Sequence, residues 1–252
     1  MVTLRSVELI YDAFGYADAS VLLKVGNTHV FCSVSLQKTV PPFLHGQPTG
    51  WLTAEYGMLP TSTQQRLKRE ACQTQRNSRH VEISRLIGRC FRSIVDLTLI
   101  KEKTIYIDCD VLQADGGTRV AAITAANYAL ALAVERWIEQ GILKKTILTE
   151  SIAAISAGIL NDEVVLDLTY EQDAQSDADF NFVMTKSGKI VEIQGTAEKK
   201  PISQELFNQV HSLAKEGIKQ LFETCDSVGR PQKKKEYLGA STLKKLSFKY
   251  GS

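Results

Sequence analysis

The chain has 252 residues, 44% of them hydrophobic and 23% charged, and its formal net charge is +2. This composition is typical of a globular protein, with enough apolar residues for one large domain or two closely packed halves. No apolar run reaches the roughly 18 residues of a transmembrane helix, and the N-terminal residues MVTLRSVELIYD lack the pattern of a secretion signal. The sequence therefore excludes a protein built of membrane-spanning helices, and we expect no membrane partner.

The cysteines indicate a reducing compartment. They are odd in number, and none belongs to a CxxC pair of the kind found in zinc sites and redox motifs. We therefore predict reduced, mostly buried thiols in a cytoplasmic protein, without a disulfide framework. The five are Cys32, Cys72, Cys90, Cys109 and Cys225.

Positive charge is concentrated in two segments. From Arg230 to the C-terminus there are seven Lys and Arg residues, with Glu236 as the acid. Between Arg66 and Arg92, eight Lys and Arg residues accompany two Glu residues. Local basic clusters favour contact with a polyanion such as a nucleic acid or a phosphate ligand, although a solvated helix face has a similar pattern.

The first half of the chain predicts a hairpin, a helix, a strand and a second helix in this order. Residues 20–36 form two β-rich runs joined at Gly26-Asn27, a hairpin signal. Apolar residues recur at helical spacing from about Ser78, and residues 104–112 alternate as in a strand. Residues 118–141 predict an Ala- and Leu-rich helix that is apolar almost all round and therefore buried.

The second half repeats this pattern. Hairpin signals occur at Asn161-Asp162 and at residues 186–189, and a helix is predicted from an N-cap at Ser203 to about Glu223. Hairpins followed by a helix, twice, predict an α+β fold of two similar halves. We place one catalytic domain at residues 1–226, with halves at about 1–145 and 146–226, and a basic, flexible tail at 227–252.

The stretch DVLQADGGTR (residues 110–119) is a candidate anion site. Glycines at the start of a helix let an anion approach the unpaired N–H groups there, and Thr118 and Arg119 add a hydroxyl and a forked cationic donor. The alternative is a tight turn at Gly116-Gly117 in which Thr118 only caps the helix. The spacing is not that of a P-loop, which argues against an ATPase.

Two further segments carry residues suited to phosphate chemistry. Asp173, Asp177 and Asp179 lie between two predicted strands, where carboxylates could hold Mg²⁺; the alternative is an acidic, solvated turn. Arg79 lies in the first turn of a predicted helix, where the alternative is a surface arginine balanced by Glu82. Together, Arg79 and GGTR could hold phosphate and the carboxylates could hold Mg²⁺, which is the combination that phosphoryl transfer needs.

The sequence resembles the bacterial ribonuclease PH family of phosphorolytic 3′-5′ exoribonucleases. The resemblance runs from about Leu4 to Phe222 and rests on five segments in the same order and spacing: GWLTAEYGMLPTST, RHVEISRLIGR, DCDVLQADGGTR, DLTYEQDAQSDADFNFVMT and EIQGTAE. It implies a tRNA nucleotidyltransferase that trims the 3′ ends of tRNA precursors with inorganic phosphate, releases nucleoside diphosphates and adds nucleotides in reverse. It also implies that the two halves are of βαβ type. The resemblance further implies a homohexamer, a trimer of dimers, that binds tRNA precursors and other RNA 3′ ends.

The resemblance also implies roles for individual residues. Asp173 and Asp179 are expected to be catalytic and to hold a divalent metal, Mg²⁺, with Asp177 as an extra acid. A carboxyl acid at neutral pH needs a raised pKa, which Asp177 could provide. Inorganic phosphate is the expected co-substrate, and its binding residues are Arg79, Gly117, Thr118 and Arg119.

The chain departs from the family pattern near the expected RNA-binding loop. Arg66 and Arg69 match arginines expected to bind the tRNA, but Thr61 stands where another arginine is usual. Asn77-Ser78 replaces the usual glycines before Arg79. An alternative function is a non-catalytic RNA-binding ring subunit of an exosome-like assembly, which has no physical need for Arg79, GGTR and both aspartates together.

Overall fold

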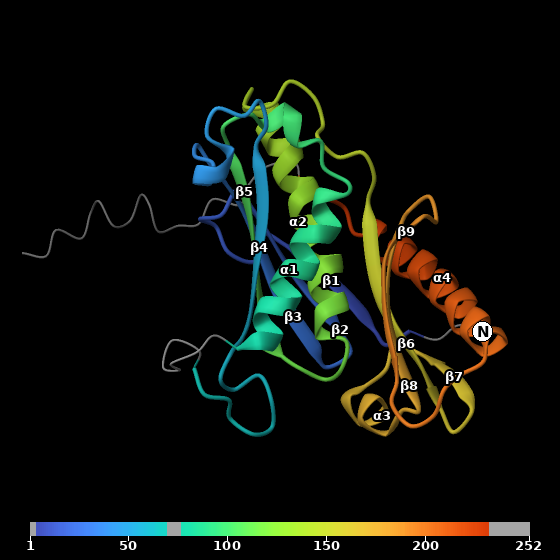
Figure 1. The fold of residues 1–252 in the computed structure, drawn as a ribbon. Coiled ribbons are helices and arrows are strands. Elements are labelled where there is room, and N and C mark those ends of the chain that lie inside the picture. Colours follow the sequence, from blue (N-terminus) through green and yellow to red (C-terminus); the bar gives the residue numbers. More distant parts are fainter. Residues whose placement is uncertain (1–3, 70–76, 232–252) are drawn as a thin grey trace, which may run out of the picture.

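The computed structural model describes residues 4–69 and 77–231, which form two β-sheets with helices between and outside them (Figure 1). The first sheet has the strand order β1-β2-β3-β5-β4. Strands β4 and β5 are parallel and the other pairs are antiparallel. The elements are β1 (Val7–Tyr11), β2 (Ala19–Val25), β3 (Thr28–Gln37), β4 (Trp51–Met58), α1 (Ser78–Arg92), β5 (Thr104–Gln113) and α2 (Thr118–Glu139).

The second sheet has the strand order β7-β6-β8-β9 and is antiparallel throughout. Its strands are joined by tight hairpins, except where a short helix links β7 to β8. The elements are β6 (Ile152–Leu160), β7 (Glu163–Leu166), α3 (Tyr170–Gln175), β8 (Ala178–Thr185), β9 (Ile190–Ala197) and α4 (Gln204–Asp226).

Helix α2 joins the two halves. It contacts β2, β3 and β5 of the first sheet and β6 of the second, and most of its 22 residues are buried. Its many alanines let both sheets approach closely, because burial of small side chains leaves little space between backbones. Figure 1 shows α1 beside α2 between the sheets, and α4 on the far face of the second sheet. Helix α2 is therefore packed between the two sheets, so residues at its start can contact both halves of the chain.

The structure confirms the predicted α+β fold of two sheet-and-helix halves. The hairpins at Gly26-Asn27 and Asn161-Asp162 are present, and the buried helix begins at Thr118. The parallel βαβ connection is β4–α1–β5 in the first half, whereas the second sheet is built from antiparallel hairpins. Residues 186–189 form the turn between β8 and β9, as expected.

Two details of the second half differ from the expectation. Residues 163–170 (EVVLDLTY), which follow the hairpin signal at Asn161-Asp162, form a strand only as far as Leu166. Asp167 has a left-handed φ of 56°, which ends the extended conformation. Residues 170–175, expected as a loop, form α3. Thr169 and Gln172 form a capping box at its start, so the signal was present in the sequence.

The thiols agree with a reduced protein as far as the structure describes them. Cys32, Cys90, Cys109 and Cys225 are buried and free, and Cys72 lies outside the described residues. The basic tail is also outside them from residue 232 onward. Within the described ranges, none of the helices has the length and apolar character needed to cross a membrane.

Candidate active site

The anion site predicted at GGTR has a specific backbone geometry. Gly116 and Gly117 have φ values of 72° and 65°, and a Cβ atom at Gly116 would lie 2.3 Å from the carbonyl oxygen of Leu168. No side chain of the described residues caps α2 at Gly117. The first N–H groups of α2 are therefore open to a ligand, and the helix dipole favours an anion there.

Thr118 is oriented by Tyr56 of β4. The Tyr56 hydroxyl donates to Thr118 Oγ1 at 2.8 Å, and both side chains are buried. Burial raises the pKa of Tyr56, so this hydroxyl stays protonated and remains a donor. Because Thr118 accepts from Tyr56, its own hydroxyl hydrogen can point to another acceptor. Sequence reasoning did not identify Tyr56, although it lies in the quoted segment WLTAEYGMLP.

Arg119 lies between the two halves. Its Nη1 donates to Gln194 Oε1 of β9 at 2.8 Å and lies 3.4 Å from Glu82 Oε1 of α1. Among the described residues, hydrogen bonds reach only Nη1, so Nε and Nη2 can face an anion. Glu82 was considered as a partner of Arg79, but in the structure it pairs with Arg119.

Arg79 lies in the first turn of α1 and its side chain is exposed. Asn77 accepts a hydrogen bond from the Arg79 backbone N–H at 3.0 Å and so caps the helix. Asn77 thus gives α1 a defined start where glycines were expected. The charge of Arg79 opposes the rise that burial causes in the pKa of both Tyr56 and Asp173. The structure therefore brings Arg79 to the same site as Thr118 and Arg119.

Asp173 lies on α3, opposite these basic groups. Burial raises its pKa, and the charges of Arg79 and Arg119 act in the other direction. The charges of both guanidinium groups thus act on this carboxyl group, and Asp115 Oδ1 accepts the backbone N–H of Tyr170 at the start of the same helix. The start of α2 and the exposed side of α3 therefore face each other.

Asp179 lies on β8, on the face that looks toward α2. Phe180 and Phe182 contact Phe207 of α4, so the alternate residues of β8 point to the opposite face of the sheet. Gln194 of β9, which bonds to Arg119, lies on that same side. Burial raises the pKa of Asp179, and the charges of Asp173 and Glu198 raise it further.

The expectation that Asp177 raises the pKa of its neighbour is wrong. Asp177 forms an ion pair with Lys199 at 2.9 Å, and this hydrogen bond lowers its own pKa. Its other carboxylate oxygen accepts the backbone N–H of Asp162, in the turn between β6 and β7. Glu198 is a third acid near Asp173 and Asp179, and its charge raises the pKa of both. It directly follows β9 and donates its backbone N–H to the Asp177 carbonyl at 2.9 Å. Glu198 stands in the quoted segment EIQGTAE, but nothing in the sequence placed it beside the aspartates.

The acids fit a metal ion only in part. In the described ranges, no group of three or more His, Cys, Asp or Glu side chains is arranged to hold a metal. Asp173 does raise the pKa of Asp179, so the two carboxylates share one region of negative potential. Mg²⁺ binds through one or two carboxylates together with water and substrate phosphates, and two aspartates satisfy that requirement.

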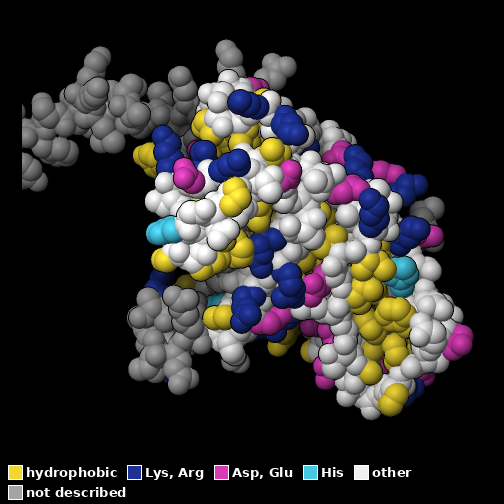
Figure 2. Space-filling view, turned by 45° about the horizontal axis from the view of Figure 1, so that its top comes forward, with side chains coloured by type: hydrophobic (Ala, Val, Ile, Leu, Met, Phe, Trp, Pro, Cys, Tyr) yellow, Lys and Arg dark blue, Asp and Glu magenta, His cyan; other side chains and the backbone are white. Residues whose placement is uncertain are grey.

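The two arginines expected to bind RNA lie in a loop of the first half. Arg66 and Arg69 are exposed in the loop that follows β4, and residues 70–76 are outside the described part of the chain. Figure 2 shows Lys and Arg side chains next to Asp and Glu side chains in the middle of one face, where the two halves meet. The surface where the halves meet thus carries both signs of charge.

Comparisons with known proteins agree with this geometry. Residues 3–134 match domain 1 of the 3′ exoribonuclease family, and residues 150–217 match domain 2. A protein named ribonuclease PH from Neisseria gonorrhoeae (strain NCCP11945) is 48% identical over 219 residues, which are 87% of this chain and 90% of that protein. This chain belongs to the 3′ exoribonuclease family.

Solved structures of this fold extend the comparison. Rice (Oryza sativa) Rrp46 has a TM-score of 0.69 at 19% identity and covers 88% of this chain and 95% of its own. An Archaeoglobus fulgidus exosome with RNA bound to the active site has a TM-score of 0.71 at 20% identity, covering 88% of this chain and 89% of that chain. At these identities the likeness shows the fold alone.

Family membership gives the chain its activity. As a ribonuclease PH relative in the 3′ exoribonuclease family, it is a phosphorolytic 3′-5′ exoribonuclease with phosphate as a substrate. This activity is better supported than a non-catalytic ring subunit. The roles of the individual residues, the metal and the RNA substrate are matters of proposal.

Proposed function

We propose that the chain trims the 3′ ends of tRNA precursors with inorganic phosphate and adds nucleotides in the reverse reaction. The observation that carries this proposal is the apposition of basic groups and open N–H groups on α1 and α2 to the carboxylates of α3 and β8. The guanidinium charges of Arg79 and Arg119 act on the pKa of Asp173, which supports a site with both signs of charge. Attack of phosphate on a phosphodiester needs this pairing of anion binding and charge neutralisation.

The phosphate is held by the first half of the chain in this proposal. The open N–H groups at Gly117 and Thr118 bind its oxygens, and the Thr118 hydroxyl donates to it from the orientation that Tyr56 imposes. Arg119 and Arg79 supply forked, charge-assisted hydrogen bonds. The bound phosphate is thus aimed at the carboxylate side, where the RNA 3′ end must lie.

The carboxylates of the second half act on the RNA side of the reaction. Asp173 and Asp179 would hold Mg²⁺, which would neutralise charge between the two anionic reactants. Asp179 donates a proton to the leaving ribose 3′ oxygen in phosphorolysis and takes it back in synthesis. Burial together with the charges of Asp173 and Glu198 raises the pKa of Asp179, as this role as an acid requires.

The wider organisation follows from the same family. We propose a cytoplasmic homohexamer, a trimer of dimers, whose subunit is a catalytic domain at residues 1–226 with halves at about 1–145 and 146–226. Arg66 and Arg69 contact the body of the tRNA through its phosphates, since both are exposed on one loop. The tail at 227–252 adds nonspecific affinity for RNA through its positive charges.

A tRNA precursor labelled at its 3′ end, incubated with protein, Mg²⁺ and phosphate, tests the substrate assignment. Labelled nucleoside diphosphate should be released from the precursor and from a short unstructured RNA. Arg66→Ala and Arg69→Ala should weaken tRNA binding and reduce its log–log salt slope by about one unit each. Equal losses on tRNA and on the short RNA would contradict a role in binding the tRNA body.

A further inference from the structure

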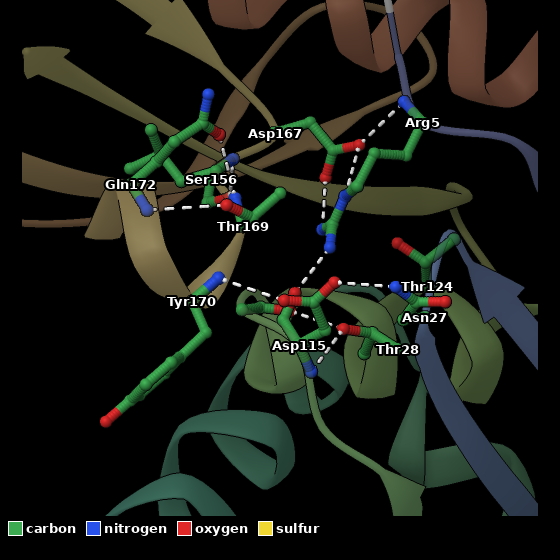
Figure 3. Close-up of polar contacts among 12 residues, drawn as sticks. Arg5, Asn27, Thr28, Asp115, Thr124, Ser156, Asp167, Thr169, Tyr170 and Gln172 are labelled. Atoms are coloured by element: carbon green, nitrogen blue, oxygen red, sulfur yellow. Dashed lines mark hydrogen bonds and ion pairs between the residues drawn. The ribbon is translucent and has the colours of Figure 1, made fainter. Parts of the chain in front are cut away.

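Arg5, two residues before β1, contacts two segments that are distant in the sequence (Figure 3). Its Nε and backbone N–H both donate to Asp167 Oδ2 at 3.0 Å, and its Nη2 donates to Asp167 Oδ1 at 2.6 Å. Its Nη1 donates to the backbone carbonyl of Asp115. The side chains of Arg5 and Asp167 are 15% and 5% exposed, so this ion pair is largely shielded from water. Arg5 thus links the first sheet, the second sheet and the loop before α2.

Asp115 connects the same loop to α3. Its Oδ1 accepts the backbone N–H of Tyr170, the first residue of α3, at 3.2 Å. Its Oδ2 accepts Asn27 Nδ2 at 3.2 Å, from the turn between β2 and β3. Figure 3 shows Asp115 between Tyr170 on one side and Asn27 and Thr28 on the other. The residue before the two glycines therefore touches the helix that carries Asp173.

The backbone of the glycine loop is fixed by the same contacts. Thr28 Oγ1 accepts the Asp115 N–H at 3.0 Å and donates to the Gly116 carbonyl at 2.7 Å. A Cβ atom at Gly117 would lie 3.3 Å from Arg5 Nη2, so the guanidinium lies directly against this glycine. Both glycines have left-handed φ values, and glycine can leave this conformation for others at little steric cost. External contacts are therefore needed to hold the loop in one conformation.

We propose that Arg5 is a positioning residue for phosphorolysis, which together with Asp167 and Asp115 sets the GGTR loop at a fixed distance from Asp173. Arg5 contacts neither the phosphate nor the RNA; it acts through the loop and through α3. Its guanidinium binds a carboxylate on the second half with a rigid fork while it holds the loop carbonyl with the remaining nitrogen. This proposal rests on the phosphate-binding role proposed for GGTR.

The experiment compares Arg5 with a second ion pair at the other end of α2. Arg136 donates from Nη1 and Nη2 to the two oxygens of Asp12, at 2.8 and 2.5 Å, and their side chains are 7% and 1% exposed. Arg5→Ala and Arg136→Ala each remove the guanidinium group from a shielded aspartate, so both should lower Tm. They differ in that the Arg136 pair lies far from the loop.

Steady-state phosphorolysis is measured on the full chain below both Tm values, with phosphate and RNA varied separately. Arg5→Ala should lower kcat/KM for phosphate about 10- to 100-fold, because misplacing a binding group by about 1 Å has effects of this size. Its affinity for RNA in the absence of phosphate should not change. Arg136→Ala should stay within about twofold of the parent enzyme, as expected for a distant, independent site. Arg5→Lys keeps the charge without the fork and should give an intermediate loss.

A double-substitution cycle and a site control complete the test. If Arg5 and Asp167 act as a unit, Arg5→Ala with Asp167→Ala should lose no more phosphate kcat/KM than the larger single loss. Arg5 variants that match Arg136→Ala in phosphate kinetics would overturn the proposal, and if Arg5→Ala does not fold, an Arg5→Lys enzyme with parental kinetics would do the same. Arg119→Ala separates the two failures: a raised phosphate KM there with parental Arg5 variants overturns only the positioning role. A parental phosphate KM in Arg119→Ala overturns the phosphate site as well.

Discussion

The two halves of the chain bring opposite chemistry to one site. The first half contributes the open start of α2, the Thr118 hydroxyl and the guanidinium groups of Arg79 and Arg119. The second half contributes Asp173 on α3 and Asp179 on β8. Neither half alone has both the anion-binding groups and the acids, so the distance between the halves is itself part of the active site. The contacts that cross between them, such as Arg119 with Gln194 and Asp115 with Tyr170, set that distance.

The halves also differ in how their functional groups are supported. The basic groups lie at the first turns of two long helices, and the open N–H groups need no charged side chain to bind an anion. The acids lie on a six-residue helix and on a strand, where burial raises the pKa of both carboxyl groups and the charge of Glu198 raises both further. The groups of the first half favour a bound anion, whereas the surroundings of Asp173 and Asp179 in the second half disfavour the ionised carboxylate.

The largest effect is expected on the acidic side. Asp179→Asn should lower phosphorolysis and the reverse addition of nucleotides alike, by roughly 10²- to 10⁴-fold, because both directions share one transition state and one proton transfer. Asp177→Asn is the matched control, since its carboxylate is bound to Lys199. It should retain activity within about threefold of the parent enzyme, because Asn is nearly isosteric and keeps an oxygen that can accept the hydrogen bond from Lys199. Rates in both directions, measured for each variant, decide the assignment; an Asp179→Asn enzyme with parental rates contradicts it.

A smaller but selective effect is expected on the basic side. Arg119→Ala removes a charge-assisted contact to phosphate and should cost about 2–4 kcal/mol in kcat/KM for phosphate. Affinity for RNA without phosphate should hardly change. Arg89→Ala is the control, because Arg89 also joins the halves through an ion pair with Glu192 but lies near the other end of α1. If Arg89→Ala raised the phosphate KM as much as Arg119→Ala, the effect would come from the interface between the halves and not from phosphate binding.

Tyr56 tests whether the hydroxyl of Thr118 is oriented. Tyr56→Phe removes the donor at 2.8 Å from Thr118 Oγ1 without changing the ring. We expect a loss of about 0.5–1.5 kcal/mol in kcat/KM for phosphate, the usual contribution of one hydrogen bond. Tyr128→Phe is the control, since this tyrosine of α2 donates its hydroxyl to Asp226 at 2.9 Å. Phosphate kinetics that change equally in both variants would assign the effect to packing of α2.

The raised pKa of Asp179 has a consequence for stability. An acid whose pKa is higher in the folded chain binds its proton more tightly when folded, so its ionisation opposes folding above that pKa. Asp179 therefore lowers stability at neutral pH, and the cost disappears as the pH falls through its raised pKa. Asp179→Asn should raise Tm at pH 7 by up to about 3 °C, and by less at pH 4. Thermal unfolding at the two pH values measures this; an unchanged or lower Tm at pH 7 would mean that the folded chain does not disfavour the charged form.

The first half could be predicted from the sequence in more detail than the second. The start of the buried helix α2 could be predicted from the glycine pair that precedes Thr118, because turn and helix signals are local. In the second half, α3 was not predicted although its capping box is present in the sequence. The sequence also suggested Asp177 as the acid that raises the pKa of Asp179, whereas Glu198 has this effect in the structure. Glu198 follows a different strand from the aspartates, and Arg5 lies 162 residues from Asp167. Such contacts depend on how the halves pack, and a single sequence carries no local signal for them.

The most direct test of a site shared between the halves follows the phosphate itself. Unlabelled RNA is incubated with labelled inorganic phosphate and either the parent enzyme, Arg119→Ala or Asp179→Asn, and the released nucleotides are separated. We predict that label appears in the terminal phosphate of nucleoside diphosphates with the parent enzyme and is lost with each variant, while both variants still bind RNA. Unlabelled nucleoside monophosphates, or label transfer that survives both substitutions, would contradict the account.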